Sequence, residues 1–250
     1  LFRAIRFGFV GGYGSAYPRG TALPQLYQRV NRLSAALSSI ADLSMVILGG
    51  KLKVKESISG RFADALSALY QASAVLKLHA DRDEPVSEQK IVLAAANTEL
   101  RRAEQALDGI LRNFPMAWLG TVLRWLFFPF GLRQQKNSDN LSHGITKSMM
   151  EQGEPRNTLT SGMYLPQNDD EPMTQLEKAM MAALACDDVR LRLKQAYGSG
   201  SVKPGSIDAT IAQASEENFI NDDEKEMLDL WLTLRSAVVA VDDFDGGVTS

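Results

Sequence analysis

Few side chains in this 250-residue sequence are suited to acid–base, nucleophilic or metal chemistry. There are two histidines, His79 and His143, and one cysteine, Cys186. These three residues lie far apart in the chain and do not give the paired spacing of a zinc site. We therefore expect no metal site, and we interpret both histidines as capping or surface residues.

Nucleophilic chemistry is also disfavoured. Cys186 precedes Asp187 and Asp188, and neighbouring carboxylates raise the pKa of a thiol. The segment TSGMY at residues 160–164 does not match a nucleophile elbow, and the acidic residues 169–171 lack the spaced loop of a calcium site. We interpret Cys186 as structural, residues 169–171 as a solvated loop, and the chain as having no catalytic residue of its own.

Composition narrows the class of protein further. The hydrophobic fraction is 45%, the charged fraction is 23%, and the net charge is −3. Such values are normal for a globular protein and do not suggest a nucleic-acid partner. A single cysteine excludes an internal disulfide and suits the cytoplasm.

Helical periodicity dominates the elements that would position any site, and strand-type alternation is nearly absent. Three long helices are predicted at about residues 24–48, 51–78 and 87–113, each about 38 Å long. Long helices joined by short loops predict an all-α antiparallel bundle. The residues expected to face its core are Leu26, Val30, Leu33, Leu37, Ile40 and Met45, then Phe62, Leu66, Leu69, Ala72 and Leu76, then Ile91, Ala95, Leu100, Ala103, Leu107 and Ile110.

Shorter helices are expected later in the chain, at about residues 140–151, 172–185, 189–197, 207–216 and 222–241. The flexible composition of GSGSVKPGS predicts a boundary near residue 200. Three regions result: residues 1–20 as the end of a preceding helix and a linker, in a chain cut from a longer protein; residues 21–200 as the helical bundle; and residues 201–250 as a C-terminal helical hairpin with an acidic tail.

The most apolar stretch is NFPMAWLGTVLRWLFFPFGL at residues 113–132. Pro115 and Pro129 limit its helix to about 20 Å, whereas a bilayer core is about 30 Å thick. Arg124 lies within it, which a lipid-exposed span tolerates poorly. Residues 109–138 carry four basic residues and no acidic one. The stretch is therefore not expected to cross a membrane as a single helix.

Two interpretations of this stretch remain open. It is either a core helix covered on all sides, or it lies in a membrane interface, where tryptophans favour the headgroup level and basic flanks meet anionic lipid. In the second case the residues predicted to contact the membrane are Trp118, Val122, Arg124, Trp125, Phe127, Phe128 and Arg133.

Four segments carry a family resemblance. They are RLSAALSSIADLSMVILGGKLKVKESISGRFADALSALYQASAVLK (32–77), AEQALDGILRNFP (103–115), SGMYLP (161–166) and AVDDFD (240–245). With these segments the chain resembles the C-terminal part of the large bacterial acyl-CoA dehydrogenases of fatty-acid β-oxidation, the FadE type. RFADALSALYQASAVL is also similar to the extra helical domain of mitochondrial very-long-chain acyl-CoA dehydrogenases.

The resemblance implies a flavoenzyme that converts an acyl-CoA to a trans-2-enoyl-CoA. In that family a glutamate removes the α proton while FAD accepts the β hydride, and both the flavin-contacting segment and the glutamate-glycine motif precede this region. Glu56 and Glu151 are not followed by glycine, and LGGKLK falls in the accessory region. FAD is therefore expected in the full-length enzyme, with no catalytic or cofactor-binding residue in these 250 positions.

The resemblance favours an accessory helical region that packs on an upstream catalytic core, contributes to a homo-oligomer and associates peripherally with the inner membrane. The core would bind the acyl-CoA substrate. The alternative is a non-catalytic helical module that binds lipid or a partner protein on its own. A self-contained enzyme is disfavoured because no convergent set of polar groups is evident.

Overall fold

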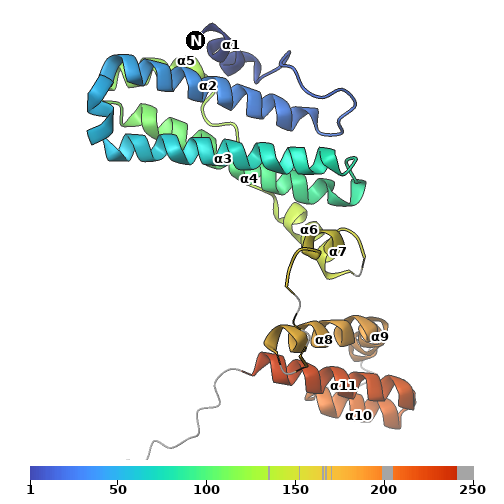
Figure 1. Ribbon diagram of the computed structural model, residues 1–250. Coiled ribbons are helices and arrows are strands. Elements are labelled where there is room, and N and C mark those ends of the chain that lie inside the picture. The colour runs from blue at the N-terminus through green and yellow to red at the C-terminus, as the bar shows by residue number, and fades with distance from the viewer. Residues whose placement is uncertain are drawn as a thin grey trace, which may run out of the picture. The chain divides into compact units, whose positions relative to one another are not determined.

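The computed structural model describes residues 1–134, 136–151, 153–164, 166, 168–169, 171–198 and 205–240. All regular secondary structure in these ranges is helical, which confirms the all-α fold class (Figure 1). The helices are α1 (Phe2–Val10), α2 (Pro24–Leu48), α3 (Glu56–Asp81), α4 (Gln89–Arg112), α5 (Ala117–Phe127), α6 (Asp139–Met150), α7 (Arg156–Thr160), α8 (Pro172–Ala185), α9 (Asp187–Gly198), α10 (Ile207–Glu216) and α11 (Asp222–Val239), with 3-10 turns at Gly49–Val54 and Val86–Glu88.

The chain divides into two compact units, Leu1–Leu159 and Thr160–Ser250. The sequence predicted boundaries at residues 20 and 200 instead. In the structure α1 packs on α2 and α5, and α8 and α9 pack in the second unit with α10 and α11. The division therefore follows helix packing, and not the composition of the linker.

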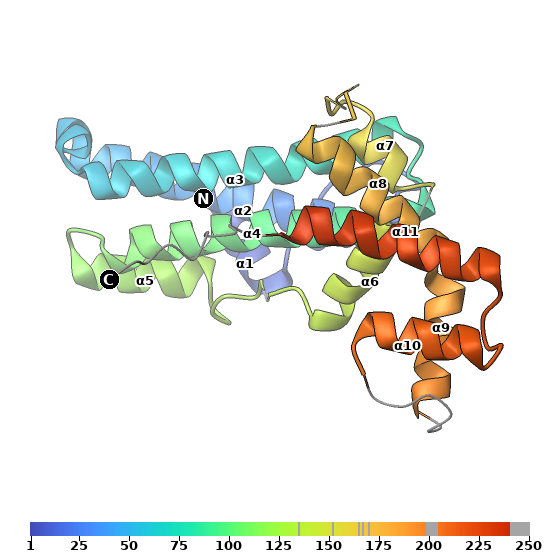
Figure 2. The same ribbon diagram turned by 90° about the horizontal axis from the view of Figure 1, so that it is seen from below.

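The first unit is an antiparallel arrangement of α2, α3 and α4, in which α3 and α4 lie side by side along their length (Figures 1 and 2). Pro24 begins α2, where its missing N–H costs nothing. Gly49 ends the helix with a φ of +50°, a conformation that glycine adopts readily. Helix α5 returns along α4, and α1 lies on α2 and α5.

Most of the predicted core residues are buried. Confirmed as buried are Leu26, Leu33, Ile40, Leu69, Ala72, Leu76, Leu100, Ala103, Leu107 and Ile110, whereas Val30, Leu37, Phe62, Ile91 and Ala95 are half-buried. Two predictions were wrong: Leu66 is 62% exposed and Met45 is 55% exposed. Leu66 follows Ala65, which is fully buried, and successive residues of an α-helix are rotated by about 100°.

A buried ion pair joins α2 to α4. Arg32 Nη2 lies 2.8 Å from Glu104 Oε1, and both side chains are almost fully buried. The other oxygen of Glu104 accepts hydrogen bonds from the backbone N–H groups of Arg133 and Gln134, at 2.9 and 2.8 Å. Burial raises the pKa of Glu104 and lowers that of Arg32. One carboxylate therefore fixes two helices and the loop that follows α5.

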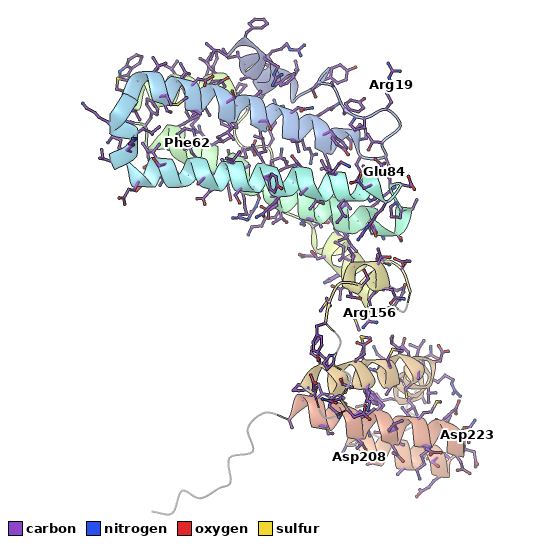
Figure 3. The ribbon with its side chains drawn as sticks, in the orientation of Figure 1. Arg19, Phe62, Glu84, Arg156, Asp208 and Asp223 are labelled. Atoms are coloured by element: carbon purple, nitrogen blue, oxygen red, sulfur yellow. The ribbon has the colours of Figure 1, made fainter. Side chains whose placement is uncertain are left out.

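The far end of the α3–α4 hairpin holds a second polar cluster. His79, expected at the surface or as a cap, is instead buried, with Nδ1 3.7 Å from Glu88 Oε2, because α3 continues beyond residue 78 to Asp81. Glu84 accepts a hydrogen bond from the backbone N–H of Ala22 at 2.6 Å and so joins the hairpin to the loop before α2 (Figure 3). His143 is exposed on α6, as predicted.

By length and composition the segment Pro24–Val54 is able to cross a membrane. Its contacts identify a core helix instead. Arg32 lies within it and is buried against Glu104, and α2 packs on α1, α3 and α4. A charged pair that is satisfied inside the protein is not expected on a lipid-exposed span.

The second unit is built from α8 to α11. Its core consists of Cys186, Val189, Leu193, Ile211, Ala214, Ile220, Leu228 and Trp231. The Cys186 thiol donates to the carbonyl of Met227 at 3.3 Å, and burial raises its pKa, as suits a structural cysteine. Asn221 and Glu224 form a capping box at the start of α11. The acidic tail after residue 240 lies outside the described residues.

Candidate membrane-facing surface

Helix α5 approaches α4 most closely at Gly120. The residues it buries are Gly120, Leu123 and Phe127. A Cβ atom added at Gly120 would lie 2.3 Å from the carbonyl oxygen of Leu111, so only glycine permits this approach. The side of α5 that carries Gly120, Leu123 and Phe127 therefore faces the bundle.

The opposite side of α5 presents large apolar residues to solvent. Trp118 is 68% exposed, Val122 is 45% exposed and Trp125 is 62% exposed. Spacings of four and three residues place them on one helix face. Helix α5 also buries the apolar side chains of Leu123 and Phe127, so it is apolar on both sides, whereas a surface helix usually has one polar face. The exposed face of α5 is therefore a candidate interaction surface.

Helix α1 extends the same apolar face. Phe9 lies edge-on to Trp125 and to Phe130, with ring centroids 6.3 and 6.2 Å apart. The close approach of α1 to α5 depends on Gly8, where an added Cβ would lie 2.9 Å from the carbonyl oxygens of residues 126 and 127. We define the aromatic surface as the exposed residues Phe2, Phe9, Trp118, Val122, Trp125 and Phe130.

The charges around the aromatic surface are positive. Neither residues 1–41 nor residues 109–138, which contain all of it, include an aspartate or a glutamate. Arg3 and Arg6 are exposed on α1, with their guanidinium carbons 5.9 and 4.9 Å from the ring of Phe7. Arg133 lies 4.7 Å over the ring of Phe130. The surface is therefore both aromatic and cationic.

The seven predicted membrane-contact residues do not form one group. Trp118, Val122 and Trp125 are exposed, but Phe127 and Phe128 are 1% and 3% exposed. These two were wrongly assigned to a contact surface, because the end of α5 turns them into the core beside Leu123.

The two predicted arginines, Arg124 and Arg133, both form contacts within the first unit. Arg124 donates through Nε to Asp108, which also binds Arg112, so this pairing holds α5 to α4. Arg133 is half-buried and donates to the carbonyl of Phe9 at 3.3 Å. Sequence reasoning missed Phe2 and Phe9. Both lie in the segment FRAIRFGFV, whose aromatic and basic residues and lack of acidic residues could have predicted them.

The described residues include neither a cluster of metal ligands nor a favourable position for LGGKLK at a flavin. Among them there is no group of three or more His, Cys, Asp or Glu side chains that could hold an ion. Gly49 and Gly50 of LGGKLK follow the C-terminal end of α2, where the helix dipole is negative and disfavours a pyrophosphate. Glu56 and Glu151 are both exposed, at the start of α3 and after the end of α6.

Comparison with known protein families identifies a match over nearly the whole chain. The family model described as "Acyl-CoA dehydrogenase, C-terminal, bacterial type" matches residues 1–244. No solved structure matches the chain. The family match covers both compact units and agrees with the resemblance carried by the sequence segments.

Proposed function

The chain belongs to the family of C-terminal domains of bacterial-type acyl-CoA dehydrogenases, and from this premise we propose that it is an accessory helical region that attaches the enzyme to an anionic membrane. The family is one of oxidoreductases that generally use FAD, and a C-terminal domain implies association with a catalytic core. In the proposal that core binds FAD and acyl-CoA, and the enzyme is a homo-oligomer in the cytoplasm at the inner membrane.

The observation that carries the membrane proposal is the aromatic surface. Contiguous exposed apolar patches on soluble proteins commonly mark interaction sites. Tryptophans placed at the headgroup level, together with Arg3 and Arg6 in a segment that contains no acidic residue, suit a lipid interface better than a polar protein partner. Each basic residue close to an anionic bilayer contributes about 1 kcal/mol, and burial of the aromatic rings adds to this.

Co-sedimentation with vesicles tests the proposal. The parent chain is expected to sediment with vesicles of equal parts phosphatidylcholine and phosphatidylglycerol, less so at high salt, and not with phosphatidylcholine alone. Trp118→Asp/Trp125→Asp is expected to abolish sedimentation without lowering the melting temperature, because both side chains are exposed.

The matched control is Leu66→Asp/Tyr70→Asp. These residues are equally exposed but lie on α3, outside the aromatic surface. The control is expected to sediment like the parent. A parent that never sediments, or equal losses in the two double variants, would contradict membrane attachment through this surface.

A further inference from the structure

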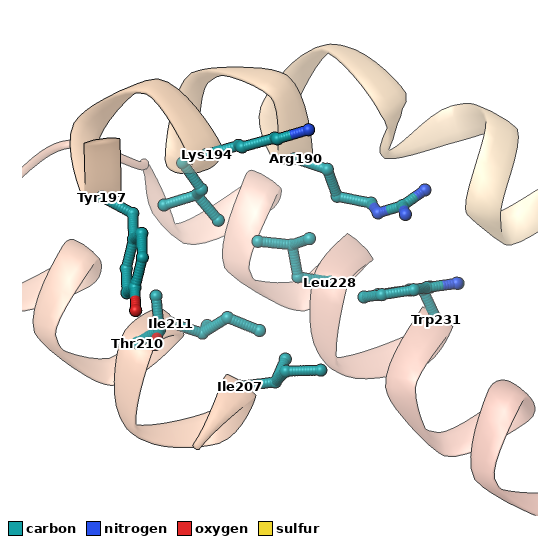
Figure 4. Close-up of a pocket in the computed structure, with 9 residues that line it drawn as sticks. Arg190, Lys194, Tyr197, Ile207, Thr210, Ile211, Leu228 and Trp231 are labelled. Carbon is teal, nitrogen blue, oxygen red and sulfur yellow. The ribbon is translucent and has the colours of Figure 1, made fainter. Parts of the chain in front are cut away.

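The second unit contains a cavity that the proposed membrane attachment does not use (Figure 4). It lies between α9, α10 and α11 and has a volume of about 330 Å³. That volume is at the lower end of the range of small-molecule sites. The side chains that line it are Arg190, Leu193, Lys194, Tyr197, Ile207, Thr210, Ile211, Leu228 and Trp231.

The cavity has an apolar interior and basic side chains on one side. The interior is formed by aliphatic side chains and Trp231, with Leu228 and Ile211 among them. Arg190 and Lys194 lie along the α9 side, opposite Ile207 on α10 (Figure 4). None of the described residues that line the cavity is acidic.

The two cations differ in their partners. The guanidinium carbon of Arg190 lies 4.5 Å from the ring of Trp231, and its Nη1 lies 3.6 Å from a carboxylate oxygen of Asp187. Lys194, one turn further along α9, forms no ion pair with any described residue. Lys194 is exposed at the edge of the apolar cavity, where its ammonium group is placed to pair with the anionic end of a ligand whose apolar part fills the cavity.

We propose that this cavity binds a linear alkyl chain that ends in an anionic head group. The chain would displace water from the interior between Leu193, Ile211 and Leu228, and the head group would pair with Lys194. A fatty acid and an acyl thioester share this chemistry. A short carboxylate would leave the apolar interior unfilled, and a neutral alcohol would not pair with the cations of the α9 side.

Trp231 provides a reporter for binding. The chain has three tryptophans, so Trp118→Phe/Trp125→Phe leaves only the one that lines the cavity. This background also removes the tryptophans of the membrane-facing surface, so the result does not depend on the proposed membrane attachment. Decanoate and decanoyl-CoA, each added below its micelle concentration, are expected to change the fluorescence of Trp231 saturably. Whichever ligand binds more tightly identifies the source of the alkyl chain.

Two variants and one control locate the site. Lys194→Gln is expected to weaken binding by about fivefold or more, as for the loss of one favourable charge contact. Ile207→Phe places a larger side chain in the cavity from an exposed position and is expected to prevent saturation at an unchanged melting temperature. Arg235→Gln removes an exposed charge of α11 that does not line the cavity and is expected to leave binding unchanged.

The ligand controls are decanol and acetate, which separate the alkyl chain from the charge. Both are expected to bind at least about fivefold more weakly than the better of the two decanoyl ligands. The proposal is overturned if neither decanoyl ligand gives a saturable signal, if Lys194→Gln binds like Arg235→Gln, or if decanol binds as tightly as the better decanoyl ligand.

Discussion

At the scale of single residues, the first unit depends on two carboxylates of α4. Glu104 binds Arg32 of α2 and two backbone N–H groups that follow α5, and Asp108 binds Arg124 of α5. The helical spacing of apolar residues could not reveal these pairs, because their partners are separated by many residues in sequence. The same pairs hold α5 in the orientation that exposes Trp118 and Trp125.

Glu104→Gln is expected to destabilise the protein by about 3–5 kcal/mol, because it leaves the Arg32 charge buried without a counter-ion. Urea unfolding followed by circular dichroism measures the change. The control is Asp81→Asn, which breaks the exposed pair with Lys77 and is expected to cost less than about 1 kcal/mol. Similar small losses in both variants would show that the Arg32–Glu104 pair does not stabilise the fold.

Leu69→Ala and Leu66→Ala compare two leucines of α3 that sequence periodicity placed together in the core. Leu69 is buried, so its truncation is expected to cost about 2–5 kcal/mol. Leu66 is exposed, so its truncation is expected to change the free energy of unfolding by less than about 0.5 kcal/mol. The reverse order would mean that α3 is rotated relative to its position in the structure.

At the scale of elements, periodicity predicted the long helices and the prolines predicted the short length of α5. The sequence could not decide which side of α5 is buried, because most of its surface is apolar and both sides satisfy a hydrophobic pattern. The close approach at Gly120 resolves this, since the side that carries Gly120 packs on α4 and the tryptophans face outward. The unit boundary was missed for a related reason: α8 and α9 precede the flexible linker in sequence but pack with the helices that follow it.

Gly120→Ala tests this orientation of α5. The added methyl group would meet the Leu111 carbonyl and is expected to destabilise the protein by about 1–3 kcal/mol and to weaken vesicle binding by displacing α5. Gly60→Ala, in α3, is the matched control. Nothing lies within 4 Å of the added atom there, so stability is expected to rise by about 0.4–1 kcal/mol. A neutral or stabilising effect at Gly120 would contradict the packing of α5 on α4.

At the scale of the whole molecule, the net charge of −3 is unevenly distributed between different parts of the chain. The segments that form the aromatic surface carry no acidic residue, whereas Asp222, Asp223 and Glu224 begin α11 in the other unit. Composition alone therefore gave no indication of a nucleic-acid partner and could not locate the aromatic surface with its basic residues. The two segments are far apart in sequence, and only the packing of α1 against α5 joins them.

The purified chain is expected to be colourless and inactive. The LGGKLK glycines follow the C-terminal end of α2 and neither Glu56 nor Glu151 precedes a glycine, so we expect acyl-CoA dehydrogenation to require the catalytic core. The visible absorption spectrum and acyl-CoA-dependent dye reduction measure this, with a chain that includes the upstream core as the positive control. A stoichiometric flavin band or turnover by the 250-residue chain would show that this chain itself binds flavin or catalyses the dehydrogenation.

Quenching of tryptophan fluorescence by brominated lipid tests the central proposal most directly. In a Trp231→Phe variant the remaining tryptophans are Trp118 and Trp125, both exposed on α5. If the aromatic surface enters the interface, vesicles of phosphatidylglycerol and brominated phosphatidylcholine quench this fluorescence, and quenching is strongest when the bromines lie near the headgroups. Unquenched fluorescence of protein that sediments with the vesicles, or of protein that never binds them, would contradict attachment through this surface.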